Sequence, residues 1–111
     1  MCDRGNNRIQ VFQKDGTFVN EVFIAKTTGA AGSVWDIDLS PDQVYLYNAD
    51  GVNMKVWILD RQGLGIVDSF GHHGRQAGQF HWIHNLATDS HGNIYTAEVS
   101  TGMRVQKFSM R

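Results

Sequence analysis

The stretch CDRGNNRIQVF at residues 2–12 decides the fold, because the chain repeats it twice. It returns as ADGVNMKVWIL at residues 49–59 and as AEVSTGMRVQKF at residues 97–108. The basic residue before the apolar run stands at positions 8, 55 and 104, so the steps are 47 and 49 residues. A period of roughly 40 to 50 residues is typical of propellers, solenoids and other repeat arrays. The sequence therefore predicts a repeat architecture.

Each repeat carries the alternation of polar and apolar residues that is typical of β-strands. RIQVF at residues 8–12, KVWIL at 55–59 and RVQKF at 104–108 all show it. In the middle unit we expect four strands, near residues 34–39, 44–49, 55–59 and 65–70. We expect two strands before this unit, near 8–12 and 18–23, and three after it, near 82–88, 93–98 and 104–108. Four antiparallel strands per unit are typical of the blade of a β-propeller.

The predicted fold class is therefore all-β, a β-propeller segment built from four-stranded antiparallel blades. Residues 1–23 correspond to the end of one blade, 33–70 to a complete blade, and 82–108 to the first three strands of a further blade. Repeat units bury their apolar faces only against neighbours, so about three or more are needed for stability. At about 48 residues per unit, the 111 residues hold little more than two units. We expect the remaining blades of the propeller, or another copy of the chain, to complete the fold.

Composition excludes some classes of partner. The chain has 10 basic and 11 acidic residues and a net charge of −1, so a broad phosphate-binding surface for nucleic acid is not expected. No run of 18 apolar residues occurs, and we predict no membrane span. Cys2 is the only cysteine and has no internal disulfide partner.

The richest candidate site is the stretch GQFHWIHNLATD at residues 78–89, which leads into the first strand of the last unit. In propellers this strand lines the central channel. His81 and His84 are three residues apart, so a regular strand points them to opposite faces and they cannot share one metal ion. A zinc site needs three or four ligands. His84 is thus a candidate for one ligand, and the alternative is a histidine satisfied by a hydrogen bond.

Arg4 is a second candidate, because the repeat does not require it. The equivalent positions are Gly51 and Val99, whereas the basic residue at 8, 55 and 104 recurs in every unit. Recurrence favours a structural role, such as pairing with an acid of a neighbouring blade. Arg4 breaks the repeat, which favours a functional role, and the alternative is a solvated turn residue.

The motifs at residues 2–12 and 78–98, the latter with the pattern GQFxxxHxLAxDSxGNIYxAE, resemble NHL repeats. Their order and spacing are similar to the last three blades of the peptidyl-α-hydroxyglycine α-amidating lyase (peptidylamidoglycolate lyase) family. The resemblance implies a six-bladed, secreted or periplasmic propeller that uses zinc. It also implies cleavage of a peptidyl α-hydroxyglycine to an amidated peptide and glyoxylate.

The resemblance assigns roles to individual residues. It implies that His84 is a zinc ligand and that Arg4 is a catalytic arginine. Trp82 stands where the family has an active-site methionine, and we predict that Trp82 and His81 contact substrate. Asn85 stands where the family has an aspartate that helps to bind a structural calcium ion, and its amide carries no charge. The other zinc ligands and a catalytic tyrosine would lie before residue 1, so we expect the isolated chain to be inactive.

The alternative is a non-enzymatic NHL propeller that binds protein, peptide or carbohydrate. Trp82 and Asn85 depart from the lyase pattern and favour this reading. NHL-type RNA binding is disfavoured by the net charge of −1. Because a fold alone does not settle function, the two readings stay open at the level of sequence.

Overall fold

Three antiparallel sheets make up the computed structural model of the protein, which describes residues 1–29 and 31–110. The first sheet has the order β1 (Cys2–Asp3), β2 (Arg8–Phe12), β3 (Phe18–Phe23), and a one-turn 3-10 helix, η1 (Arg4–Asn6), links β1 to β2. The second has the order β4 (Asp36–Leu39), β5 (Tyr45–Asp50), β6 (Lys55–Asp60), β7 (Ile66–Phe70). The third has the order β10 (Arg104–Phe108), β9 (Ile94–Glu98), β8 (Ile83–Thr88).

The all-β prediction is confirmed, and each expected strand has a counterpart in the structure. One strand was missed: β1 pairs with β2 through Cys2↔Ile9 and Asp3↔Arg8. A two-residue strand is too short to show alternation, which explains why the sequence pattern did not reveal it. Among the described residues, no helix has the length and apolar character needed to cross a membrane.

The three repeats share the same backbone geometry just before the strand that begins with the basic residue, which is β2, β6 or β10. In each, the residue that precedes the basic position has a left-handed backbone, with φ of 57° at Asn7, 55° at Met54 and 42° at Met103. The register shift between Val11 and Phe12 in the first sheet recurs between Ile58 and Leu59 in the second. The sequence repeat is therefore a repeat of conformation.

In the first and third sheets the recurring basic residue pairs with an acid of its own sheet, so the prediction of a partner in a neighbouring unit was wrong for these two. Arg8 Nε donates to Asp3 Oδ2 at 2.7 Å, and Arg104 Nε donates to Glu98 Oε2 at the same distance. The middle sheet differs, because Trp57 Nε1 donates to the acid, at 2.9 Å from Asp50 Oδ2. Lys55 instead places its ammonium 4.9 Å from the centre of the Trp57 ring. The acid is in cross-strand register with the basic position in all three sheets, which explains the pairing.

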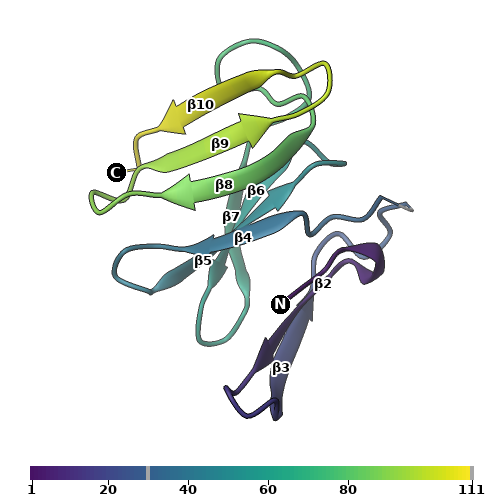
Figure 1. The fold of residues 1–111 in the computed structure, drawn as a ribbon, viewed down its shortest axis with the longest axis vertical. Coiled ribbons are helices and arrows are strands. Elements are labelled where there is room, and N and C mark those ends of the chain that lie inside the picture. The colour runs from purple at the N-terminus through teal and green to yellow at the C-terminus, as the bar shows by residue number, and fades with distance from the viewer. Residues whose placement is uncertain (30, 111) are drawn as a thin grey trace.

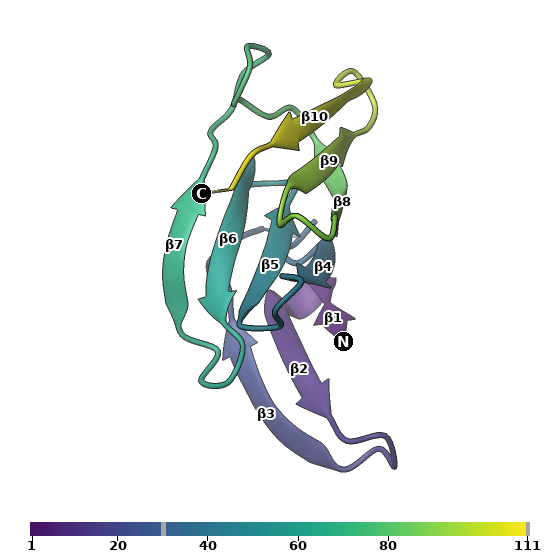
Figure 2. The same ribbon diagram turned by 90° about the vertical axis from the view of Figure 1, so that its left-hand side faces the viewer.

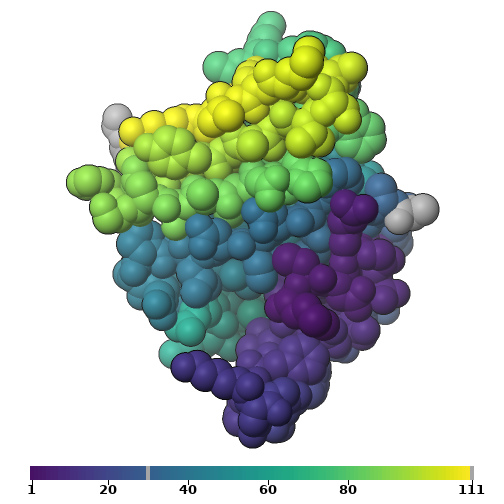
Figure 3. Space-filling view, viewed as in Figure 1, coloured from purple at the N-terminus to yellow at the C-terminus, as the bar shows by residue number. Residues whose placement is uncertain are grey.

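The sheets stack in chain order, with the second between the other two (Figures 1 and 3). Apolar side chains fill both junctions. The junction of the first and second sheets buries Ile9, Ile24, Val34, Leu46, Leu59 and Leu64. The junction of the second and third buries Tyr47, Ala49, Met54, Val56, Phe80, Ile83, Leu86 and Ile94. Because the apolar faces at these two junctions are buried only against a neighbouring sheet, the stability of each unit depends on its neighbours.

Strands β4 and β8 are edge strands of different sheets and lie side by side (Figures 1 and 2). Two aspartates of β4 join them. Asp36 accepts the N–H of Leu86 at 3.0 Å, and Asp38 accepts the N–H of Thr88 at 2.9 Å. The second oxygen of each carboxylate accepts the N–H of the next residue of β4. Each carboxylate thus satisfies an unpaired amide on both edges, so neither edge is left with orphan donors.

We expect Asp38→Ala to destabilise the fold by about 1 to 3 kcal/mol, because the Thr88 amide and hydroxyl both lose this acceptor. Asp68→Ala is the matched control, since exposed Asp68 accepts only from its neighbour Ser69. It should change stability by about 0.5 kcal/mol or less. Urea denaturation measures both variants, and equal midpoints would contradict the joining role of Asp38.

Candidate functional site

Trp35 lies immediately before β4 and is held from several sides. Its indole Nε1 donates to the carbonyl of Gly32 at 2.8 Å, and its backbone N–H donates to Ala49 at 3.0 Å. The backbone of Gly51 lies against the ring, and a Cβ at that position would stand 2.6 Å from an indole carbon. These contacts fix the Trp35 side chain in one orientation at the end of the sheet.

Arg4 lies on one face of this indole. Its guanidinium carbon is 4.6 Å from the centre of the Trp35 ring, within the range of a cation–π interaction. Gly32 allows the approach, because it has φ of 74° and a Cβ there would collide with the Arg4 carbonyl at 1.8 Å. The first sheet thereby places an arginine on a tryptophan of the second.

Trp82 and His84 reach the same indole from the third sheet. The His84 ring meets Trp35 edge-on, with centroids 5.4 Å apart and an interplanar angle of 90°. The Trp82 ring lies 6.1 Å from Trp35. Trp82 has a left-handed backbone with φ of 56°, and its N–H points to the sulfur of Met54 at 3.1 Å. We call Arg4, Trp35, Trp82, His84 and Asn85 the Trp35 cluster.

The hydrogen bond between His84 and Asn85 defines the chemistry of the imidazole. His84 Nδ1 lies 2.7 Å from Asn85 Oδ1. An amide oxygen can only accept, so Nδ1 carries the proton and Nε2 keeps its lone pair. Asn85 Nδ2 in turn points to Asp36 Oδ2 at 3.4 Å. Metal-binding histidines have this arrangement, in which the second ring nitrogen donates to a supporting group.

Donor chemistry tests the metals that the family resemblance implies. His84 fits one position of a zinc site, but no group of three or more His, Cys, Asp or Glu able to hold a metal occurs in residues 1–29 and 31–110. A complete zinc site needs ligands from outside this chain. Calcium does not fit, because Asn85 Oδ1 is bonded to His84 and both Asp36 oxygens accept amides.

His81 lies outside the Trp35 cluster. Its Nδ1 is 3.2 Å from Nε2 of His73, and its Nε2 is 2.6 Å from the Thr101 hydroxyl. Only an edge contact between the His81 and Trp82 rings, with centroids 6.2 Å apart, connects it to the cluster. The structure therefore brings Arg4, Trp82, His84 and Asn85 together and separates His81 from them.

The sequence analysis did not select Trp35 as a site residue. Its position carried a signal, because Trp35-Asp36 in the second unit stands where His84-Asn85 stands in the third. Asp36 pairs with Ala49 and Asn85 pairs with Ala97, two equivalent alanines. Trp35 and His84 therefore occupy the same position of two successive repeats, and they contact each other in the cluster.

Buried Glu98 anchors the loop that leads into the cluster. It accepts from the His81 backbone N–H at 2.7 Å and from Arg104 Nε at 2.7 Å, and Gln106 adds a further bond. Burial works to raise the pKa of this carboxyl, but the hydrogen bonds from Arg104, His81 and Gln106 outweigh it. They hold the pKa below its usual value of 4.5. The carboxylate therefore stays charged at neutral pH.

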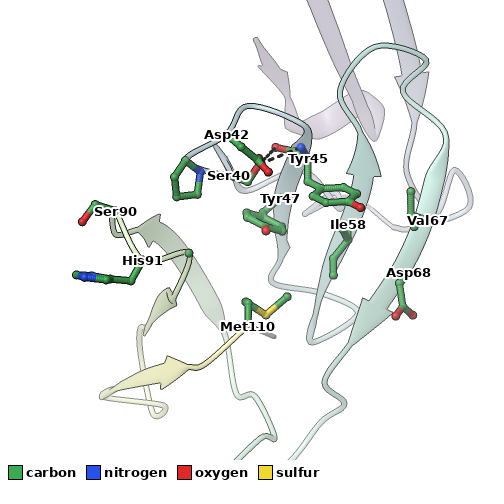
Figure 4. A pocket seen from close by; sticks show the side chains of 12 residues that line it. Ser40, Asp42, Tyr45, Tyr47, Ile58, Val67, Asp68, Ser90, His91 and Met110 are labelled. Atoms are coloured by element: carbon green, nitrogen blue, oxygen red, sulfur yellow. Dashed lines mark hydrogen bonds between the residues drawn. The ribbon is translucent and has the colours of Figure 1, made fainter.

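A cavity of about 530 Å³ opens at the far end of β4, away from the cluster (Figure 4). Tyr45, Tyr47, Ile58 and Val67 line it from the second sheet, and His91 and Met110 line it from the third. No member of the Trp35 cluster contributes to its wall. The cavity lies beside a part of the third sheet that has three strands where the second has four.

Comparison with protein families and with curated proteins finds no match for this chain. The fold and the site define an all-β protein of three repeated antiparallel sheets, with an arginine, two tryptophans and a histidine gathered at one end of the edge strands.

We expect Gly51→Ala to destabilise the protein by about 1 to 3 kcal/mol, because the new methyl group overlaps the Trp35 ring and the Ile83 carbonyl. Gly5→Ala is the matched control, since a Cβ there meets nothing within 4 Å. Thermal denaturation measures stability, and near-UV circular dichroism reports the tryptophan environment. Equal stability of the two variants would contradict the close contact between Gly51 and the Trp35 ring.

The Glu98 carboxyl should make stability depend on acid pH. Its pKa is lower in the folded state, so its stabilisation is fully present above pH 4.5 and is lost as the pH falls through the folded pKa. We expect Glu98→Gln to flatten the stability curve in this window, whereas Asp68→Asn at an exposed position should keep its shape. Urea midpoints measured from neutral to acid pH test this. Parallel curves for Glu98→Gln and wild type would refute it.

Proposed function

We propose that the chain is a segment of a six-bladed NHL-repeat β-propeller of a lyase-like protein. The Trp35 cluster would be its share of a zinc-dependent site that cleaves peptidyl α-hydroxyglycine to an amidated peptide and glyoxylate. One observation carries the proposal. Arg4 and His84, which the family resemblance selects from the first and third repeats, both contact the same residue, Trp35.

The residues of the cluster have chemistry suited to this role. His84 keeps a free lone pair on Nε2 for a metal, since Asn85 holds its other nitrogen. The Arg4 guanidinium is a permanent positive charge that can stabilise negative charge on a substrate oxygen. Zinc, when bound, would supply Lewis-acid polarisation of the substrate hydroxyl. The indoles of Trp35 and Trp82 form an apolar wall beside both groups.

The edge of the third sheet supports the interpretation as a segment. β10 is the outer strand of this sheet, and Met110, two residues beyond its end, lines the cavity of Figure 4. Val67 and Val105 are 58% and 70% exposed, which is unusual for apolar strand residues with a packing partner. A fourth strand next to β10 would cover this region, and the remaining blades or another copy of the chain would supply it.

A second candidate is a non-enzymatic NHL propeller that binds peptide, protein or carbohydrate at the same surface. The two indoles 6.1 Å apart, with Arg4 stacked on one of them, favour it. Such a group offers apolar faces and hydrogen-bond donors to a ligand without any metal. A secreted or periplasmic setting is implied only by the resemblance to the lyase family and does not extend to this second candidate.

Zinc titration followed by NMR of the imidazole signals tests the metal role, because each histidine reports separately. We expect the His84 signals to shift with zinc, with weak affinity because one ligand is present. Asn85→Ala should weaken this shift about tenfold, since the supporting acceptor is lost. His91→Ala, in an exposed turn, is the control. His84 signals that do not respond to zinc would remove the metal role.

The isolated chain should release no amidated peptide from a peptidyl α-hydroxyglycine substrate, because it supplies only one zinc ligand. In a protein that also contains the missing blades, His84→Ala and Arg4→Ala should each abolish turnover. If the second candidate is correct, Trp35→Ala and Trp82→Ala instead abolish ligand binding, and chelation of metal changes nothing. Turnover by the isolated chain would overturn the assignment of the missing ligands to other blades.

A further inference from the structure

The connection between β7 and β8 folds back on itself and brings two histidines together. Phe80 N–H donates to the carbonyl of His72 at 2.8 Å, and Gly74 N–H donates to the carbonyl of Phe80 at 2.9 Å. His73 and Phe80 therefore form a parallel β-bridge. Phe80 is fully buried and anchors this segment in the core. The backbone thus fixes His73 next to His81, although eight residues separate them.

The distance between the two rings matches that of a metal chelate. His73 Nε2 and His81 Nδ1 are 3.2 Å apart. Two imidazole nitrogens at about 2.1 Å from one ion lie about 3.0 Å apart in octahedral geometry and about 3.4 Å apart in tetrahedral geometry. In this contact the two nitrogens face each other, so both rings turn when their lone pairs converge on one ion. His73 is exposed, so water can fill the remaining coordination positions.

Thr101 supports His81 from the other side. Its hydroxyl oxygen is 2.6 Å from His81 Nε2. When this oxygen accepts the Nε2 proton, Nδ1 keeps its lone pair and faces His73. Gly102 holds the turn in place, since a Cβ there would stand 2.2 Å from the His81 carbonyl oxygen. A metal-binding histidine with a hydrogen-bonded second nitrogen is oriented in this way.

We propose that His73 and His81 form a binding site for a divalent transition-metal ion, separate from the Trp35 cluster. Imidazole nitrogens suit Cu²⁺, Ni²⁺ and Zn²⁺, with Cu²⁺ bound most tightly, and they do not suit Mg²⁺ or Ca²⁺. By binding both histidines, the ion links the β7–β8 connection to the start of the third sheet. Because the His81 ring contacts Trp82, the bound ion also restrains the Trp82 side chain of the Trp35 cluster.

Arg75 adds one positive charge to the hollow beside His81, so affinity for an ion comes from the two imidazoles and not from the local charge. The adjoining hollow contains Arg75, Glu98 and Arg104. The guanidinium of Arg104 is bonded to both oxygens of Glu98, so that these two charges offset each other. The site does not depend on the proposed function, because the His73 and His81 side chains bond to each other and to Thr101, not to Arg4 or His84.

Calorimetric titration of the full chain without a polyhistidine tag tests the proposal, with NiCl₂ and then CuCl₂ as probes at neutral pH. We expect one ion per chain, and each of His73→Gln and His81→Gln should weaken binding tenfold or more. Thr101→Val should weaken it by a smaller factor. His91→Gln, in an exposed turn, is the matched control and should leave affinity within twofold of wild type.

Thermal denaturation gives a second readout, since an ion that binds only the folded chain raises its melting temperature. Nickel should raise the melting temperature of wild type and of His91→Gln, and should not raise that of His73→Gln or His81→Gln. The proposal is overturned if wild type binds neither ion. Unchanged binding by His73→Gln and His81→Gln, or an equal loss in the control, would also overturn it. Neither result bears on the zinc-dependent NMR shifts of His84, so the two proposed metal sites are tested independently.

Discussion

Two carboxylates on β4 are the constraint on which the arrangement of the second and third sheets depends. Asp36 and Asp38 are two residues apart, so they project from the same side of the strand toward β8. Each accepts one amide from β4 and one from β8. Two sheet edges that would otherwise expose unpaired donors are thereby joined through side chains, without forming a continuous sheet.

The candidate site follows from this junction. With β4 and β8 side by side, the residues just before and at the start of these strands become neighbours, and Trp35 meets Trp82 and His84. The first sheet is attached in a related way. Asn7 Oδ1 accepts the N–H of Ser33 at 2.9 Å, as Met54 accepts that of Trp82 one unit later. This attachment holds η1 close enough for Arg4 to stack on Trp35.

The sequence predicted strand positions well because a period-two pattern repeated three times leaves little freedom of register. It also selected Arg4 and His84, which break that repeat. The sequence did not reveal that Asp36 and Asp38 bond to β8, because their partners Leu86 and Thr88 lie 50 residues further along the chain. His81 was grouped with the site on proximity in sequence. The left-handed backbone at Trp82 and the register shift after Ile83 separate it from His84, and neither is visible in residue types.

Amide hydrogen exchange at Leu86 and Thr88, measured by NMR, tests the central junction most directly. Each amide donates to a carboxylate of β4, Leu86 to Asp36 and Thr88 to Asp38, so its exchange reports whether this junction is formed. The account predicts slow exchange at both amides in the wild type. It predicts fast exchange in the Asp36→Ala/Asp38→Ala variant, with protection of β9 and β10 retained. Fast exchange of Leu86 and Thr88 in the wild type would contradict it.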